Sequence, residues 1–523
     1  RRIEMKPCGL YQQPVKSNNV QSRRLCRFPM LCGFLLCQIA RILLECEWRD
    51  LDSLIAGFGD MVASFGKVPS LIGLIADSKF HIFHIQPQNL MSRTLFCRTN
   101  SQRFVSMGLL MRICIYVFVV CLLPSVSAFA GDWPQWLGPN RDGVAVGEKF
   151  SLPKDGATFP TLWKVSLGEG WAAPVVLDGK LVIHHRPGVE ESIDCLDSSS
   201  SKLLWRYAFA SGYRDGFGMA EGPRSTPTIA GGKVFAYGPQ GILNCLDLKT
   251  GKLKWTVNVA KQFRSPQGFF GRCCSPLVVG TLVMIDVGGS GAGVVAFDVE
   301  TGKVRWESGE YENDYSSPVH ATIGDVSCAM FFMRDGFWGL NAETGKELFF
   351  ERFRSPINAS VNAATPLLVG NTVFVTSCYD VGGAAWSLKA NGATGVGAET
   401  IWKKGGMLDG HYATPVHHDG YLYGFHGRQE RGPELRCVSL ADGSVQWSSG
   451  RMASGNLLLA DGKLFVITEA GELLLVPASP KGFSVLYRQQ VLGLEARAHF
   501  AISNGKLYAR DKRRLVCLQL DKD

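Results

Sequence analysis

From residue 160 onward, short apolar runs alternate with polar, glycine-containing turns in a unit that recurs along the chain. Segments 225–255 and 274–306 show it best: a small residue and Pro, an apolar run, a Gly turn, two more apolar runs ending in Asp, a Thr-Gly-Lys turn and a Trp. Short apolar runs bounded by such turns predict β-strands. Each unit therefore predicts an antiparallel sheet of four strands.

The small residue and Pro that open the unit recur six times, 42 to 53 residues apart, as Ala173-Pro174, Thr226-Pro227, Ser275-Pro276, Ser317-Pro318, Thr365-Pro366 and Thr414-Pro415. Degenerate openings follow near Ser454-Gly455 and Arg497-Ala498. A repeat of this length with four strands is typical of a propeller blade. The sequence predicts an all-β, eight-bladed β-propeller of four-stranded antiparallel blades.

The last unit offers only about three strands. The segment TLWKVSL, residues 161–167, carries Trp163 where the other units carry their closing aromatic residue. We expect it to supply the fourth strand, so that the N-terminal and C-terminal strands pair within one blade. Such pairing closes the ring and removes exposed sheet edges.

A different pattern precedes the repeats. Residues 107–130 combine Arg112, an apolar run and Ala128-Phe129-Ala130, which is typical of a signal peptide cleaved after Ala130. The run is short for a membrane span, so we expect a periplasmic or secreted protein without a transmembrane anchor in its mature form. An uncleaved anchor helix is the alternative.

The segments around this signal complete the expected organisation. Residues 1–106 show no repeat and no amphipathic period, so we expect a non-native or disordered extension produced by a start site placed too early, with Met107 or Met111 as the true start. Residues 131–160 form a leader segment, and residues 161–523 form the propeller.

Charge argues against a nucleic-acid partner. The chain has 55 Lys and Arg and 46 Asp and Glu, but residues 1–130 hold 15 and 7 of them. Residues 131–523 therefore carry 40 basic and 39 acidic side chains. A nucleic-acid binder carries its basic excess in its folded part, and this part is close to neutral.

The repeat resembles a known family. The opening Pro, the Asp-x-x-Thr-Gly-Lys turn and the Trp are similar to pyrroloquinoline-quinone (PQQ)-like propeller repeats. The leader DWPQWLGPNRDG, residues 132–143, is similar to the start of secreted PQQ-like propeller proteins. The resemblance covers residues 131–523. Tryptophan-aspartate repeats are less similar, because their Gly-His and Trp-Asp pairs do not recur here.

The family contains BamB-like proteins without a cofactor and quinoprotein alcohol dehydrogenases, including polyvinyl-alcohol-dehydrogenase-like proteins. A quinoprotein site needs an aromatic platform, cationic donors, oxygen ligands for Ca²⁺ and an Asp that accepts the alcohol proton. In such propellers these groups precede the innermost strands. The candidate proton acceptors are Asp314 and Asp409. The candidate cofactor-binding residues are Trp171, Glu221, Arg224, Arg272, Asn362 and His411, of which Glu221 and Asn362 are also candidate Ca²⁺ ligands.

Cysteines suggest one further feature. Cys273 and Cys274 directly precede a blade opening. The resemblance implies a disulfide between these neighbours, which an oxidising compartment permits. The alternative, favoured by the unlike residues around them, is that they are small buried hydrophobic residues. Four other cysteines share one repeat position and are expected in the core: Cys195, Cys245, Cys437 and Cys517.

Two functions remain open. In the first, which we favour, the protein is a non-catalytic binding or scaffold propeller whose rim loops hold a protein, peptide or glycan of the cell envelope. In the second, it is a PQQ- and Ca²⁺-dependent dehydrogenase that oxidises an alcohol or polyol. No Cys-x-x-Cys-His haem motif occurs in the chain, so a dehydrogenase would need a separate electron-acceptor partner.

Overall fold

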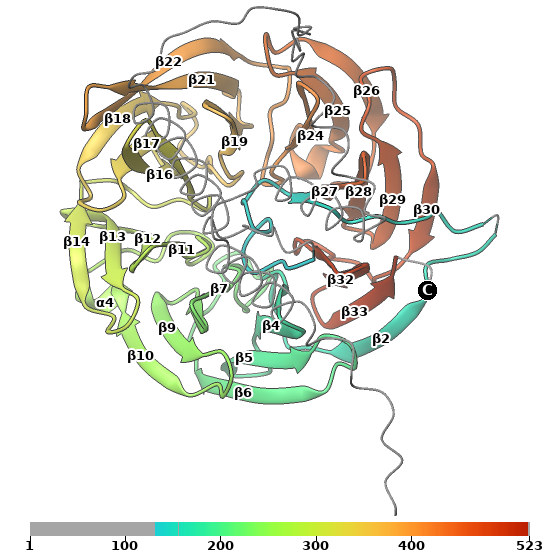
Figure 1. The fold of residues 1–523 in the computed structure, drawn as a ribbon, viewed down its shortest axis with the longest axis horizontal. Helices are drawn as coiled ribbons and strands as arrows, with labels where there is room; N and C mark the ends of the chain where they lie inside the picture. Colours follow the sequence, from blue (N-terminus) through green and yellow to red (C-terminus); the bar gives the residue numbers. More distant parts are fainter. Residues whose placement is uncertain (1–130, 155, 521–523) are drawn as a thin grey trace, which may run out of the picture. The chain divides into compact units, whose positions relative to one another are not determined.

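The computed structural model describes residues 131–154 and 156–520. Within them, eight antiparallel sheets lie around a ring (Figure 1). The prediction of an eight-bladed, all-β propeller is confirmed. The expected signal peptide (107–130) and extension (1–106) lie outside the described residues. Among the described residues, no helix has the length and apolar character needed to cross a membrane.

The first four blades follow one another along the chain. Their strands are β3 (Val175–Leu177), β4 (Lys180–His185), β5 (Glu190–Asp197) and β6 (Leu203–Ala210) in blade 1; β7 (Thr228–Ala230), β8 (Lys233–Tyr237), β9 (Ile242–Asp247) and β10 (Leu253–Asn258) in blade 2; β11 (Leu277–Val279), β12 (Leu282–Gly289), β13 (Ala292–Asp298) and β14 (Val304–Ser308) in blade 3; and β15 (Val319–Ile323), β16 (Val326–Met333), β17 (Gly336–Asn341) and β18 (Glu347–Arg352) in blade 4.

The remaining blades continue the same order. Their strands are β19 (Leu367–Val369), β20 (Thr372–Ser377), β21 (Gly382–Asn391) and β22 (Gly395–Lys404) in blade 5; β23 (Val416–His418), β24 (Tyr421–His426), β25 (Glu434–Ser439) and β26 (Val445–Arg451) in blade 6; β27 (Gly455–Ala460), β28 (Lys463–Thr468), β29 (Glu472–Pro477) and β30 (Tyr487–Gln490) in blade 7; and β31 (Ala501–Ser503), β32 (Lys506–Arg510), β33 (Arg514–Gln519) and β2 (Thr161–Ser166) in blade 8.

Ring closure is as predicted. Strand β2 pairs antiparallel with β33, and Trp163 lies opposite Cys517. This is the register that Trp205 and Cys195 adopt in blade 1. The N-terminal and C-terminal strands of the propeller therefore share blade 8.

The core consists of layers between neighbouring blades. Strand β8 is buried along its whole length, whereas the outermost strand β10 alternates between exposed and covered positions. One hydrophobic cluster joins side chains of blades 2 and 3, including Phe235 and Phe297. Middle strands that are covered on both faces need continuous apolar sequence, which explains the short apolar runs of the repeat.

The closing tryptophans connect adjacent blades. The Trp205 indole donates a hydrogen bond of 2.9 Å to the carbonyl of Leu248, in the turn between the third and fourth strands of blade 2. Corresponding bonds to the next blade come from Trp163, Trp255, Trp306, Trp402 and Trp447. The Trp of the repeat is thus a link between blades, as well as a core residue.

The leader lies across the middle of the ring (Figure 1). Trp133 pairs with Val176 of blade 1, and β1 (Val144–Ala145) pairs in parallel with β27 of blade 7. The buried Arg141 donates to the carbonyls of Pro276 and Pro318, ahead of blades 3 and 4. One short segment therefore contacts blades on several sides of the ring.

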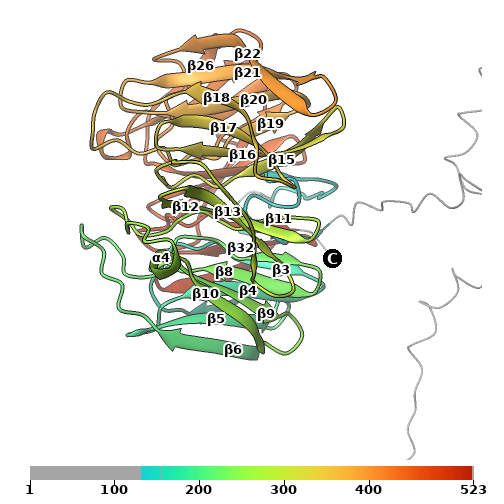
Figure 2. The ribbon, with the colours of Figure 1, turned by 90° about the vertical axis from the view of Figure 1, so that its left-hand side faces the viewer.

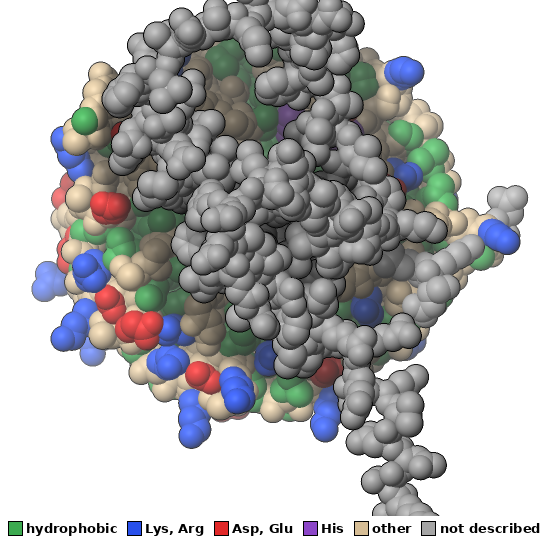
Figure 3. Space-filling view, in the orientation of Figure 1, with side chains coloured by type: hydrophobic (Ala, Val, Ile, Leu, Met, Phe, Trp, Pro, Cys, Tyr) green, Lys and Arg blue, Asp and Glu red, His purple; other side chains and the backbone are tan. Residues whose placement is uncertain are grey.

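The two faces of the propeller differ. One carries the leader, and the other carries the short helix α4 (Val259–Gln262); Figure 2 shows them on opposite sides. We call the second the loop face: it carries the segments between the last strand of one blade and the first strand of the next, and the loops between second and third strands. On the leader side, basic and acidic side chains of the described residues are interspersed along the visible edge of the ring (Figure 3).

Candidate functional site

All candidate site residues lie on the loop face, in segments that lead into innermost strands. Trp171 precedes β3, Glu221 and Arg224 precede β7, and Arg272 precedes β11. The others precede β15, β19 and β23, as Asp314, Asn362, Asp409 and His411. They are therefore distributed around the ring, and the structure brings only some of them together.

Trp171 is in contact with two guanidinium groups. Those of Arg224, before blade 2, and Arg497, before blade 8, each lie 5.0 Å from its ring centroid. Arg224 also donates to Asp215 at 2.9 Å and to the carbonyl of Phe270 at 2.9 Å. The aromatic platform expected for a flat quinone is thus occupied by side chains of the neighbouring blades.

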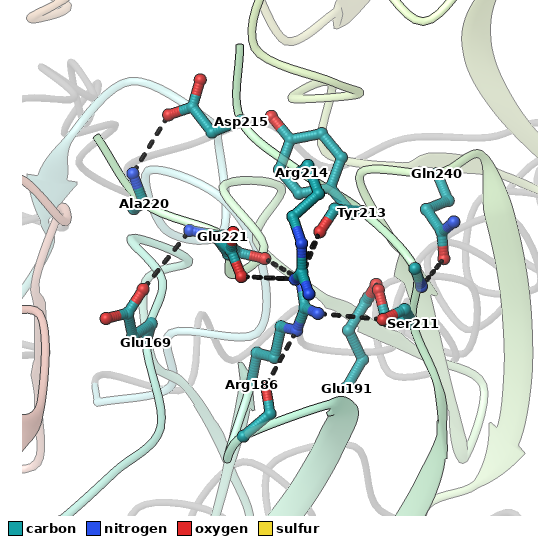
Figure 4. A network of polar contacts seen from close by, with 12 residues as sticks. Glu169, Arg186, Glu191, Ser211, Tyr213, Arg214, Asp215, Ala220, Glu221 and Gln240 are labelled. Carbon is teal, nitrogen blue, oxygen red and sulfur yellow. Dashed lines mark hydrogen bonds and ion pairs between the residues drawn. The ribbon is translucent and has the colours of Figure 1, made fainter. Parts of the chain in front are cut away.

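Glu221 belongs to a polar network between blades 1 and 2 (Figure 4). Its carboxylate pairs with Arg214 at 2.6 Å. The buried Arg186 donates to the main-chain carbonyls of Tyr213, Glu221 and Ser211 at 2.7 to 2.9 Å. These bonds hold the loop in place, and the Glu221 side chain already has a cationic partner.

Asn362 and Asp314 form a second pair, between blades 4 and 5. The Asn362 backbone N–H donates to Asp314 at 2.9 Å, and the Asn362 side chain donates to the carbonyl of Met333 at 2.9 Å. Asp314 is 3% exposed. Burial raises the pKa of Asp314 to about 8, although the Asn362 N–H and the Arg334 guanidinium act in the opposite direction. A substrate alcohol has little access to this carboxyl group.

The calcium site implied by the resemblance is not assembled. Glu221 lies between blades 1 and 2, whereas Asn362 lies between blades 4 and 5. In residues 131–154 and 156–520, no three His, Cys, Asp or Glu side chains are grouped to hold a metal ion. Glu221 and Asn362 therefore do not belong to one ligand set in the described part of the chain.

Arg272, Cys273 and Cys274 lie at the inner end of blade 3. Arg272 is buried and donates to Ser265. Both cysteines are free thiols in the structure, with Cys274 buried and Cys273 half-buried. Burial raises the pKa of Cys273 to about 12 and that of Cys274 well above its usual value. Neither thiol is a ready nucleophile at neutral pH.

Asp409 is the candidate that borders an open pocket. The pocket has a volume of about 310 Å³, between the loops of blades 5 and 6. His411 lies close by, and its Nε2 is 2.8 Å from the hydroxyl of Tyr379, a pocket residue. Burial lowers the pKa of His411 to about 4. The pocket is lined by Ile357, Cys378, Tyr379, Asp380, Asp409, His426, Gly427, Arg428, Arg431, Gly432, Glu434 and Arg451.

Most residues of this pocket do not follow from the repeat pattern. The predicted site residues precede innermost strands, whereas Tyr379 and Arg428 lie in loops between second and third strands. The available signal was the run RQERG, residues 428–432, which places two arginines beside a glycine between two apolar runs.

The loop face also exposes apolar side chains. Phe217 is 61% exposed and Phe269 is 46% exposed, and their ring centroids are 6.1 Å apart. Ile357 and Leu494 are exposed on other loops of this face. Exposed apolar groups that gather on one face are typical of interaction surfaces.

Comparison with known proteins agrees with the fold. Residues 154–336 match the family model described as outer membrane protein assembly factor BamB. BamB of Yersinia pestis is 22% identical over 378 residues, which cover 68% of this chain and 85% of that protein. A quinohemoprotein alcohol dehydrogenase of Pseudomonas putida is 27% identical over 176 residues, which cover 32% of this chain and 24% of that enzyme. The match thus spans about a quarter of the enzyme's length.

Solved structures show the same architecture. BamB from Moraxella catarrhalis aligns with a TM-score of 0.53 at 14% identity, covering 69% of this chain and 100% of that chain. The quinohemoprotein alcohol dehydrogenase of Comamonas testosteroni aligns with a TM-score of 0.53 at 14% identity, covering 76% and 82%. The resemblance to PQQ-like repeat propellers is therefore confirmed, by sequence over residues 154–336 and by fold over the described propeller.

Proposed function

We propose that this protein is an exported binding or scaffold propeller of the cell envelope, and that its loop face holds a protein partner. The observation that carries the proposal is the exposed pair Phe217 and Phe269 on that face. Phe217 also packs against Phe270, with 5.2 Å between ring centroids. Aromatic side chains held in this way present apolar area at little entropic cost.

The relatives support a binding role in kind. The Yersinia pestis relative, named an outer membrane protein assembly factor, aligns over 85% of its own length. The alcohol dehydrogenase relatives align over a quarter or less of theirs in the first matches. An assembly factor is expected to contact other proteins, and the loop face offers an exposed surface for such contact.

A dehydrogenase is the second candidate. Its support is the higher identity of some quinone-dependent relatives, such as the 32% over 166 residues shared with the Acetobacter aceti enzyme. The geometry argues against it: Trp171 carries two guanidinium groups, Glu221 is paired, and Asp314 is buried.

Site-specific photocrosslinking in cells tests the binding role. A photoreactive residue in place of Phe269 should give a discrete protein adduct. The same residue in place of Leu253, an exposed position on the outermost strand of blade 2, should give none. Equal labelling from both positions, or none from either, would argue against a partner bound at this aromatic pair.

A cofactor experiment tests the alternative. The purified protein is mixed with Ca²⁺ and PQQ, and quinone absorbance and dye reduction with primary alcohols are measured. We expect neither stoichiometric binding nor turnover. Turnover with an alcohol would establish the dehydrogenase and remove the first proposal.

Export has its own test. Gly131 is buried, and its carbonyl accepts a hydrogen bond of 3.1 Å from Asn504 in blade 8. A chain cleaved after Ala130 keeps this contact. We expect the intact mass of the exported protein to correspond to a chain starting at Gly131, and a mass that includes residues 107–130 would contradict cleavage.

A further inference from the structure

The pocket between blades 5 and 6 has a cationic wall. Arg428 and Arg431 come from the loop between β24 and β25, and Arg451 ends β26. Arg431 and Arg451 are exposed, and among the described residues neither forms an ion pair with an acidic side chain. Glu434 lies opposite Arg451 in the sheet, but its carboxylate binds Arg436 at 2.9 Å and Ser448 at 2.7 Å. Two guanidinium groups are therefore free to bind a ligand.

The third arginine is held in position. The Arg428 guanidinium lies 4.8 Å from the ring centroid of Tyr379, and the Tyr379 hydroxyl is fixed by His411. Glu430 is 3.4 Å from the Arg428 Nε. Its Nη2 also donates to Glu430 at 3.4 Å, so one edge of the guanidinium already has an acidic partner. Stacking on Tyr379 fixes the plane of the guanidinium. Arg428 is therefore a fixed part of the cationic wall, and Arg431 and Arg451 are the arginines that are free to pair with a ligand.

Acidic side chains on the opposite wall of the pocket limit how much negative charge a ligand can carry. Asp380 is exposed, and Asp409 accepts hydrogen bonds of 3.0 Å from the N–H of Gly406. These carboxylates repel a polyanion, such as a nucleic acid or a polyphosphate. The exposed Ile357 adds an apolar contact at the same site. A ligand that fits has one or two carboxylates, main-chain donors for Asp380, and an apolar neighbour.

We propose that this pocket binds the carboxylate of an acidic peptide segment, supplied by the partner protein. The inference rests on the proposed binding function and names the chemistry that the partner presents. Arginine forks match carboxylates in a bidentate manner, and an aliphatic or aromatic neighbour of the acidic residue packs on Ile357. A glutamate or aspartate beside an apolar residue is the expected motif.

Fluorescence polarisation with the full-length protein tests the proposal. The probe is a fluorescein-labelled peptide with two glutamates beside a phenylalanine, and the matched peptide carries glutamines. We expect micromolar binding of the first, and binding of the second that is weaker by about tenfold or more. An oligomer of uronic acid is the competing probe, and its binding in preference to the peptide would overturn the peptide assignment.

Variants locate the site. The double substitution Arg431→Gln and Arg451→Gln should weaken glutamate-peptide binding by about tenfold or more. Asp380→Asn should strengthen it severalfold, because a repulsive charge is removed. The matched control is Arg305→Gln, an exposed arginine on the outermost strand of blade 3, which should bind as the unaltered protein does. Unchanged binding by the double variant would overturn the proposal.

The two proposals fail separately. An adduct from position 269 without acidic-peptide binding removes the pocket ligand and keeps the loop face as a docking surface. Peptide binding that depends on Arg431 and Arg451, without an adduct from position 269, keeps the pocket and removes the aromatic docking site.

Discussion

Two individual carboxyl groups are buried within the blades, and each has a raised pKa. Asp286 in β12 and Asp314 are both nearly inaccessible. Burial raises the pKa of Asp286 to about 7 and that of Asp314 to about 8, from a usual value of 3.8. Each group therefore binds its proton more tightly in the folded protein than in the unfolded chain.

This difference predicts a pH dependence of stability. Between the unfolded pKa near 3.8 and the folded value of about 8, the folded state holds the extra proton. The free energy of unfolding should therefore decrease as the pH rises through this window. We expect thermal unfolding to show a lower Tm at about pH 9 than at about pH 5, with a smaller decrease in Asp314→Asn.

The control is Asp325→Asn, which changes an exposed carboxyl group in the turn between β15 and β16. Its pH profile should follow that of the unaltered protein. Identical profiles for Asp314→Asn and the unaltered protein would show that Asp314 does not titrate in this window.

At the scale of one element, buried arginines fix the segments that enter the loop face. Arg510, at the end of β32, donates to the carbonyls of Gly168, Asp511 and Lys512 at 3.0 Å. Arg186 and Arg334 follow the second strands of blades 1 and 4 and make similar bonds to main-chain carbonyls. In these three blades, the arginine binds the segment that leaves the last strand of its own blade.

Removing such an arginine leaves buried carbonyls without donors. We expect Arg510→Met to lower the free energy of unfolding by about 3 kcal/mol or more, as measured by urea unfolding. Arg513→Met, three positions along and largely exposed, should change it by less than about 0.5 kcal/mol. Comparable losses from the two variants would contradict this role of Arg510.

The turn glycines have two separate reasons to be glycine. Gly251 has a φ of 69°, and a Cβ there would lie 2.6 Å from the ring of Trp205. Gly179 has a φ of 71°, but a Cβ there would meet no atom within 4 Å. The Thr-Gly-Lys turn therefore needs glycine for its backbone and for the tryptophan of the preceding blade.

Alanine substitution separates these reasons. Gly179→Ala should lower the free energy of unfolding by about 1–2 kcal/mol, because of backbone strain alone. Gly251→Ala should lower it by more, because the new methyl group also displaces Trp205. The measurement is urea unfolding of both variants. Equal costs would mean that the Trp205 ring moves without loss.

The sequence predicted the repeating elements well, because each repeat signal has a local cause. The opening Pro, the Gly turns and the closing Trp each mark a fixed position in one blade. The number of blades and the pairing of β2 with β33 could therefore be predicted. The cysteine at the third strand was also placed correctly, since Cys195 and Cys245 are buried core residues.

Positions within loops were harder to predict. Whether Trp171 lies open or beneath two guanidinium groups depends on Arg224 and Arg497, which belong to different blades. No local pattern joins these three positions. The pocket likewise combines Tyr379 and Arg428 from loops of two blades, and their proximity follows from the ring, not from sequence spacing.

Across the entire ring, the leader adds contacts to those between neighbouring blades: it pairs with strands of blades 1 and 7, and Arg141 donates to carbonyls ahead of blades 3 and 4. Arg141→Met removes donors to Pro276 and Pro318, which precede two different blades. We expect a clear decrease in Tm and a broader transition by calorimetry, since those carbonyls lose their shared partner. Lys149→Met, a highly exposed leader position, is the control and should leave both unchanged. A sharp, unshifted transition for Arg141→Met would contradict the joining role.

The pairing of β2 with β33 determines when blade 8 can form during folding. The other seven blades form from consecutive strands, whereas blade 8 is complete only when Arg514–Gln519 pairs with Thr161–Ser166. Contacts between positions so distant along a chain form slowly. Until they form, the outer edge of β33 stays unpaired and open to another strand. The newly made protein therefore passes through an incomplete ring. During that interval, a chaperone can bind the unpaired strand or a protease can cleave it.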